Sequence, residues 1–149
     1  MDTEQQGDYA PPAAVRTLPS WLLGQAARRA HDLVTEALAP TGIGRQHFAV
    51  LASLAEDGPA SQAELGRRLW LDRSDTHGIV SALELSGLIE RGGDPADQRR
   101  KVVTITAAGR RNLKQLQRRI ASAQERILAP LGEREREQLL ALLARMGRS

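Results

Sequence analysis

Three adjacent cationic side chains stand at the start of a predicted strand. Arg99, Arg100 and Lys101 follow two aspartates, Asp94 and Asp97, and a segment rich in β-branched residues, VVTIT, comes directly after them. Such a cluster either solubilises the edge of a hairpin or presents positive charge to a polyanion. The elements that precede the cluster decide between these two interpretations.

Two short helices are predicted upstream of the cluster. The sequence SQAE, from Ser61 to Glu64, is a capping box, in which the Ser61 hydroxyl accepts from the amide of Glu64 and the Glu64 carboxylate reaches back. It opens a helix over 61–69. Asp72 is placed to cap the free amides of a second helix, over 72–85. The two helices are therefore separated by a turn of only a few residues.

A β-hairpin is predicted to follow the second helix, which Gly87 is placed to end. Strand patterns cover 88–91 and 101–106, and the turn-forming sequence GGDP lies between them. This order of elements is a helix-turn-helix followed by a β-wing. In such a unit the second helix enters the major groove of DNA, and a wing can place an arginine in the neighbouring minor groove. The order therefore favours a nucleic acid as the partner of the cationic cluster.

The remaining segments predict long helices. Apolar residues recur at helical spacing over 18–38, 44–56, 107–128 and 133–146, whereas residues 1–17 are polar and predict an irregular arm. The fold class is therefore mainly α with a small β-hairpin. The long helices carry more apolar surface than a small winged helix needs to cover. They pack either within one chain or between two chains.

The distribution of charge agrees with a polyanionic partner. Residues 1–60 hold seven acidic and four basic side chains, whereas residues 61–149 hold eleven acidic and seventeen basic ones. A solvated basic surface is the alternative. The chain has no cysteine, which excludes disulfides and thiol-based redox sensing. No apolar run approaches the ~20 residues of a membrane span, and the polar N-terminus is unlike a signal peptide, so we expect a cytoplasmic protein that does not contact membranes.

Several short segments of the second half form a signature. They are ELGRRL (64–69), DRS (72–74), GLIER (87–91), DPADQR (94–99) and TAAG (106–109). Through these segments the chain resembles the MarR family of bacterial transcription regulators. The resemblance covers nearly all of the chain after residue 17, and it implies a winged helix-turn-helix lobe with long dimerisation helices.

The resemblance also implies an organisation and a function. Residues 18–149 would form one MarR-like domain, with dimerisation helices at 18–39 and 107–149 and a DNA-binding lobe at 44–106. A homodimer of this kind reads a pseudo-palindrome in double-stranded DNA whose half-sites lie about one helical turn apart. We therefore expect a sequence-specific transcriptional regulator, and a repressor rather than an activator.

The predicted DNA contacts lie at the starts of the two short helices and on the wing. Arg73 is placed to contact either guanine, through a bidentate pair, or a phosphate. Arg99 matches the family's wing-tip arginine, and Asp97 is expected to orient its guanidinium through a fork-shaped pair. Arg100 and Lys101 are expected to meet phosphates. The full predicted set is Ser61, Gln62, Arg73, Ser74, Thr76, His77, Ser81, Asp97, Arg99, Arg100 and Lys101.

Many MarR-family members bind a small phenolic or anionic effector between the dimer helices and the winged lobe. The resemblance therefore nominates a set of effector-cleft residues here: Trp21, Arg28, His31, His47, Phe48 and Trp70. Each has an alternative role. Trp21 suits the apolar core of a dimer, Trp70 suits packing of the lobe from the turn between the short helices, and the histidines suit ordinary interior or surface positions.

Other classes of function find less support in the sequence. An enzyme is not expected, because no nucleophile, histidine and acid occur in a catalytic order and no paired acids occur in a cleft-like context. The histidines at 31, 47 and 77 are too scattered for a metal site, so no metal or cofactor is expected. A winged helix used only for protein contacts would not need Arg99 at the tip of its wing or a polar helix face that begins at Arg73.

Overall fold

The helices that begin after Ser61, Asp72 and Thr106 start at side-chain caps. The computed structural model describes residues 10–147. Its elements are, in order, α1 (Ala13–Arg16), α2 (Pro19–Leu38), the 3-10 turn η1 (Ala39–Thr41), α3 (Arg45–Asp57), α4 (Gln62–Leu69), α5 (Arg73–Leu85), β1 (Ile89–Gly93), β2 (Lys101–Ile105), α6 (Ala107–Leu128) and α7 (Glu133–Met146). The predicted fold class, mainly α with one β-hairpin, is confirmed.

One part of the predicted irregular arm is helical. Residues 13–16 form a single turn, α1, in which the Thr17 hydroxyl donates to the carbonyl of Ala13 at 2.7 Å. The prediction failed here because one turn is too short to show helical periodicity. The first nine residues of the predicted arm lie outside the described part of the chain.

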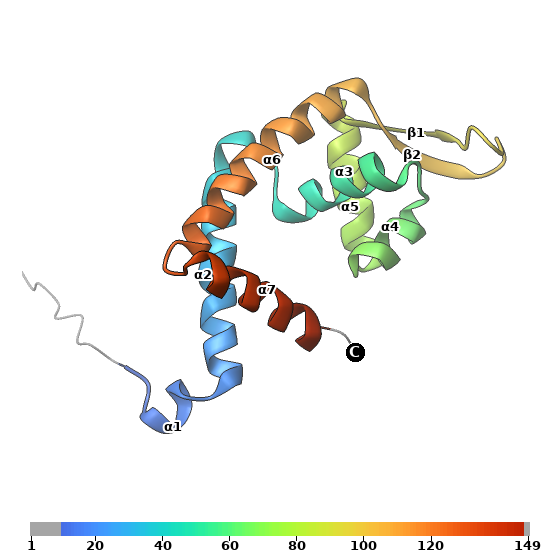
Figure 1. Cartoon of the computed structure of the whole chain (residues 1–149). Helices are drawn as coiled ribbons and strands as arrows, with labels where there is room; N and C mark the ends of the chain where they lie inside the picture. Colours follow the sequence, from blue (N-terminus) through green and yellow to red (C-terminus); the bar gives the residue numbers. More distant parts are fainter. Residues whose placement is uncertain (1–9, 148–149) are drawn as a thin grey trace, which may run out of the picture.

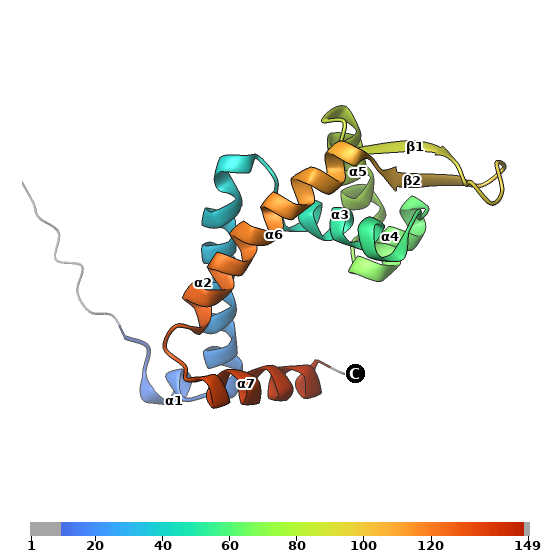
Figure 2. The ribbon, with the colours of Figure 1, turned by 45° about the horizontal axis from the view of Figure 1, so that its top comes forward.

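The molecule has two parts that α6 connects. In Figures 1 and 2, α3, α4, α5 and the β-hairpin form a lobe, and the hairpin projects from it as a wing. Helix α6 begins at the lobe and ends beside α2, whose N-terminal part extends away from the lobe. Helix α7 leaves the end of α6, where Arg136 pairs with Glu125 at 2.9 Å. None of the helices in the described residues has the length and hydropathy needed to cross a bilayer.

The core of the lobe is aliphatic and draws on every element around it. Fully buried side chains come from α3, α4, α5, the hairpin and α6, so α6 completes the lobe as well as connecting it to α2. They include Val50, Leu51, Leu54, Leu65, Val80, Leu83, Ile89, Val103, Leu113 and Leu116. The lobe is therefore a rigid support for the residues on its surface.

Backbone hydrogen bonds attach the wing to the helix-turn-helix. The strands pair antiparallel from Ile89 opposite Ile105 to Gly93 opposite Lys101. Ala60, just before α4, adds a bridge to β2: its N–H donates to the Val103 carbonyl at 3.1 Å, and the Val103 N–H donates back at 2.8 Å. Because this bridge is made of backbone, it fixes the base of the wing next to the start of α4.

A long apolar surface remains uncovered in the single chain. Although α7 lies wholly within the described residues, none of its side chains is buried, and Leu140 and Met146 are 59% and 62% exposed. Leu18, Leu22 and Leu23 on and before α2 are exposed as well. Within the single chain, these helices therefore leave part of their apolar surface uncovered.

Gly109 is a point of close approach between α6 and the wing. A Cβ atom there would overlap the Leu88 carbonyl oxygen and lie 2.7 Å from Cγ1 of Ile105. We expect Gly109→Ala to lower the free energy of unfolding by ~1–3 kcal/mol, because backbone cannot move aside cheaply. Urea denaturation measures this. Gly78→Ala is the control, because nothing lies within 4 Å of its Cβ position and it should gain up to ~1 kcal/mol from helix propensity. Equal stability of Gly109→Ala and the wild type would contradict the close approach.

Candidate nucleic-acid interface

The start of α4 is held by the predicted capping box. The Ser61 hydroxyl accepts from the Glu64 amide at 3.2 Å, and the Ser61 N–H donates to the Glu64 carboxylate at 2.8 Å. Ser61 is thereby occupied and half-buried, whereas Gln62, the first residue of the helix, borders two surface grooves. Gln62 is therefore the better placed of the two predicted contacts to donate to a ligand.

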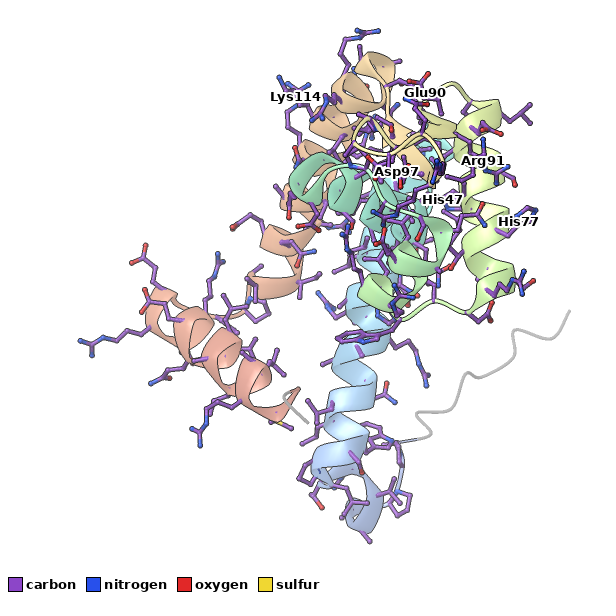
Figure 3. All side chains as sticks on the ribbon, turned by 90° about the vertical axis from the view of Figure 1, so that its right-hand side faces the viewer. His47, His77, Glu90, Arg91, Asp97 and Lys114 are labelled. Carbon is purple, nitrogen blue, oxygen red and sulfur yellow. The ribbon has the colours of Figure 1, made fainter. Side chains whose placement is uncertain are left out.

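The start of α5 presents several of the predicted contacts to solvent. Asp72 caps the helix, and its carboxylate accepts from the Asp75 amide at 2.7 Å, as predicted. Arg73, Ser74 and His77 are exposed on the following turn. In Figure 3, His77 projects outward from α5. The amide end and the polar face of α5 are thus open on one side of the lobe.

Thr76 does not belong to this exposed face, so its prediction as a DNA contact is wrong. Its side chain is 1% exposed, and its hydroxyl donates to the Asp72 carbonyl at 2.7 Å. A Cβ on Gly66 of α4 would lie 3.2 Å from this hydroxyl, so the two helices meet closely at this point. Thr76 shares the inward face with Ile79, which follows it by three residues, so helical spacing was the signal that could have identified it.

The tip of the wing is a network of aspartate turns. The Asp94 carboxylate accepts from the Ala96 amide at 2.9 Å, and the Asp97 carboxylate accepts from the Arg99 amide at 3.1 Å. The predicted fork between Asp97 and the Arg99 guanidinium is therefore wrong, because Asp97 holds the backbone of Arg99 and not its side chain. Such Asx turns are typical of aspartate. In the described residues no carboxylate pairs with Arg99, which leaves its exposed guanidinium available to a ligand.

The three adjacent cations of the wing are not equivalent. The Arg100 guanidinium pairs with Glu64 of α4 and, at 3.3 Å, with Asp94 of the wing. Lys101 is exposed and has no ion-pair partner within residues 10–147. Arg100 thus joins the wing to α4 in the free protein, whereas Lys101, like Arg99, points its charge to solvent.

Arg91 was not among the predicted contacts and serves a similar joining role. Its guanidinium lies 3.5 Å from the Glu84 carboxylate and donates to the Ser81 hydroxyl at 3.1 Å. The Arg91 amide also donates to Glu84 at 3.2 Å. The hydroxyl of Ser81, which was predicted to contact DNA, therefore already accepts a hydrogen bond from Arg91 within the protein. Figure 3 shows Arg91 beside α5, on the same side of the lobe as His77.

Two grooves adjoin each other at Gln62 and carry cations on their walls. The larger, of about 550 Å³, is lined by Gln62, Ala63, Gly66, Arg67, Leu71, Arg73 and Thr76. The smaller, of about 280 Å³, is lined by Gln62, Arg91, Lys101, Val102 and Val103. Because Gln62 borders both, the start of α5 and the base of the wing belong to one continuous surface. Arg67 is a further cation of this surface that the sequence did not single out.

The structure does not bring the predicted effector residues into one cavity. Three of them lie along α2: Trp21 is partly covered, whereas Arg28 and His31 are exposed. On α3, His47 and Phe48 are half-buried. Burial lowers the pKa of His47 and so favours its neutral form. The grooves beside α2 are lined by other residues, among them Arg45 in one and Arg119 in another.

Trp70 is the largest difference between the prediction and the structure. It was expected to pack against the lobe, but it is 93% exposed. Its φ of 52° is left-handed, a conformation uncommon for a residue other than glycine. It ends α4 by turning the chain sharply towards α5, and this turn directs the indole outward.

Comparison with known proteins places the chain in a family. The family model described as "MarR family" matches residues 41–100. An uncharacterised HTH-type transcriptional regulator of Bacillus subtilis, YxaD, is 35% identical over 105 residues, which cover 70% of this chain and 73% of the relative. The chain therefore belongs to the MarR family, whose members are DNA-binding transcription regulators and not enzymes.

Solved structures agree with this assignment over almost the entire chain. A probable transcriptional regulator from Pseudomonas aeruginosa is 35% identical, with a TM-score of 0.78 over 87% of this chain and 97% of that one. The transcriptional repressor CouR, bound to a 23-mer DNA duplex, is 26% identical, with a TM-score of 0.84 over 93% of this chain and 99% of that one. CouR from Rhodococcus jostii RHA1 has also been solved with p-coumaroyl-CoA, with 28% identity and a TM-score of 0.77 over 89% of this chain and 93% of that one.

The link between the wing and α4 should depend on pH. The hydrogen bond from the Ser61 amide and the charge of Arg100 lower the pKa of Glu64 below its ordinary value of 4.5. A carboxylate with a lowered pKa stabilises the fold above that ordinary value, and the contribution is lost as the pH falls through the folded-state pKa. We expect Glu64→Gln, which retains a capping side chain, to lower Tm near pH 7, by an amount that shrinks progressively as the pH falls below 4.5. Parallel melting curves of wild type and variant across this range would show it. A Tm difference that stays constant with pH would contradict the role assigned to this ion pair.

Proposed function

We propose that the protein is a homodimeric repressor that binds a pseudo-palindromic operator in double-stranded DNA. In this proposal residues 18–149 form one functional domain, with 18–39 and 107–149 as dimerisation helices and 44–106 as the DNA-binding lobe. The observation that carries the proposal is the continuous surface on which the start of α5 and the wing meet at Gln62, with Arg67, Arg73 and Lys101 on its walls. The repressor CouR, which has the same fold, binds a DNA duplex.

Each part of the surface would contact a different part of the duplex. Arg73, Ser74 and His77 would face base edges in the major groove, because they occupy the exposed first turns of α5. Arg99 at the wing tip would enter the neighbouring minor groove, where the negative potential is strongest. Gln62 and Lys101 would contact phosphates, whereas Arg100 would contribute mainly by holding the wing against α4.

Single substitutions should separate these contacts. We expect Arg99→Ala to weaken operator binding strongly without a change in Tm, since its exposed side chain has no partner in the described part of the fold.

Lys101→Gln should reduce the slope of log K against log salt by roughly one unit. Arg29→Gln, which removes an exposed cation from α2, is the control for net charge. Titration of labelled operator fragments, captured from genomic DNA with the purified protein, measures each effect. Unchanged affinity of Arg99→Ala would exclude the wing from the interface.

The exposed apolar surface of α2 and α7 supports the homodimer. Leucines that are half exposed along two helices leave apolar area in water unless a second chain covers it. We expect the wild type to sediment as a dimer and Leu140→Glu to shift it towards the monomer, because the charge would be buried in the interface. Leu85→Glu is the matched control, since Leu85 is 91% exposed on the lobe, away from this surface. A wild-type monomer at micromolar concentration would contradict the dimer.

We further propose that a small aromatic or anionic molecule releases the protein from its operator. CouR binds an aromatic CoA thioester. The candidate residues of this chain lie on α2, on α3 and in the turn at Trp70, and in this proposal a second chain completes the cleft between them. Competition of aromatic acids and their CoA thioesters against labelled operator is the measurement, and an operator affinity unaffected by any of them would count against release by this class.

A further inference from the structure

Helix α6 carries a second cationic surface that the proposed operator interface does not use. The residues Arg110, Arg111, Lys114 and Arg118, here named the α6 stripe, are all exposed. Arg110, Lys114 and Arg118 follow each other at intervals of four residues and so lie above one another on one face, with Arg111 beside them. Within residues 10–147 no carboxylate forms an ion pair with any of the four.

This arrangement is unfavourable for the helix that carries it. The first turn of α6 contains no acid, and Arg110 and Arg111 stand close to the positive end of its dipole. Successive cations four residues apart also repel each other. In contrast, α7 has Glu133 and Glu135 in its first turn. Helix stability therefore does not explain the stripe, and such a local conflict is typical of a functional surface.

The remaining arginines near α6 also differ from the stripe. Arg126 pairs with Glu36, and Glu125, the next acid along this face, pairs with Arg136. Glu90 on β1 is drawn near the same end of the lobe in Figure 3, but it forms no ion pair with the stripe. The positive charge of the stripe is thus left uncompensated within the described part of the single chain. The stripe lies on the first half of α6, beside the lobe, whereas the apolar surface proposed for the dimer is on α2 and α7.

The chemistry of the face favours a phosphate backbone over a protein. The residues between and beside the cations are Ala107, Gln117 and Ala121, so the face has no aromatic and no large apolar side chain. Protein interfaces use arginine too, but they are anchored by buried aromatic and large apolar residues, which this face lacks. Arginine, lysine and glutamine are among the side chains that bind phosphates without reading sequence.

The position of the stripe separates it from the operator. In Figure 3 Lys114 projects from the side of the lobe opposite to His77 and α5. The inward face of α6 is occupied by Leu113 and Leu116, which pack in the core, so the stripe points away from the lobe. A straight duplex held by α5 and the wing would leave the stripe free.

We propose that the α6 stripe binds the phosphate backbone of a second DNA duplex, without sequence preference, while the lobe holds the operator. The protein would then connect two DNA segments. This inference rests on the proposed function, which supplies the first duplex. The binding of the second duplex is argued from the charge and the placement of the α6 stripe.

The test is a two-duplex capture with the full-length protein. Biotinylated operator fragment is immobilised and loaded with protein, and a fluorescent duplex of unrelated sequence is added. The variant Arg110→Gln/Lys114→Gln/Arg118→Gln removes three cations of the stripe and keeps good helix formers. The control Arg29→Gln/Arg134→Gln/Arg145→Gln removes the same charge from exposed positions on α2 and α7. Because both variants alter the proposed dimerisation helices, sedimentation checks that each remains a dimer. Operator affinity of every variant is measured separately in solution.

We expect wild type and control to retain the fluorescent duplex and the stripe variant to lose it, with equal operator affinity in all three. If each of the three cations neutralises one phosphate, their share of the retention should fall on the order of 40-fold between 50 mM and 200 mM salt.

Retention by the stripe variant, or none by wild type on loaded operator, would overturn the inference. A stripe variant with weaker operator binding would place the stripe on the first duplex and also overturn it. Capture of polyglutamate in place of the fluorescent duplex, lost in the stripe variant, would assign the stripe to an acidic protein instead. Failure of wild type to bind operator would instead refute the proposed function.

Discussion

Glu64 connects the wing to α4, beside the surface that is proposed to hold DNA. Its carboxylate accepts from the Ser61 amide at the start of α4 and pairs with Arg100 of the wing. A single exposed ion pair contributes little to stability. The backbone bridge between Ala60 and Val103 therefore sets the position of the wing, and the pairing of Glu64 with Arg100 sets the direction in which the wing points. Because both anchors exist in the free protein, the spacing between wing and α5 is established before DNA arrives, which reduces the entropic cost of binding.

Cations that are neighbours in the sequence serve different purposes in this arrangement. Arg91 pairs with Glu84 and so holds the wing to α5, whereas Arg100 pairs with Glu64 and so holds the wing to α4. Arg99 and Lys101, on either side of Arg100, form no ion pair within the described residues and remain available to bind a ligand. The count of basic residues therefore overstates the number of phosphates that the wing can neutralise. The same distinction between compensated and uncompensated cations identifies the α6 stripe.

The sequence predicted those features that depend on local chemistry. The capping box at Ser61, the Asp72 cap and the helix over 107–128 follow from short-range rules, and the structure confirms all three. The predictions that failed depend on neighbours distant in the chain or on backbone direction. Thr76 is buried because α4 comes within contact distance at Gly66, and Trp70 is exposed because a left-handed turn directs it outward. The pairing of Arg100 with Glu64 joins residues too far apart in the chain for spacing rules to connect.

The central claim is that the wing and the start of α5 contact the same duplex at the same time. Hydroxyl-radical footprinting of the captured operator tests this most directly, because it reports the protection of each sugar. We predict that each half-site shows protection around a major-groove segment and, separately, in the adjoining minor groove. At protein concentrations that saturate the operator with the variant, Arg99→Ala should abolish only the minor-groove protection. Loss of both protections together, or retention of both, would contradict a surface on which α5 and the wing make separate, simultaneous contacts.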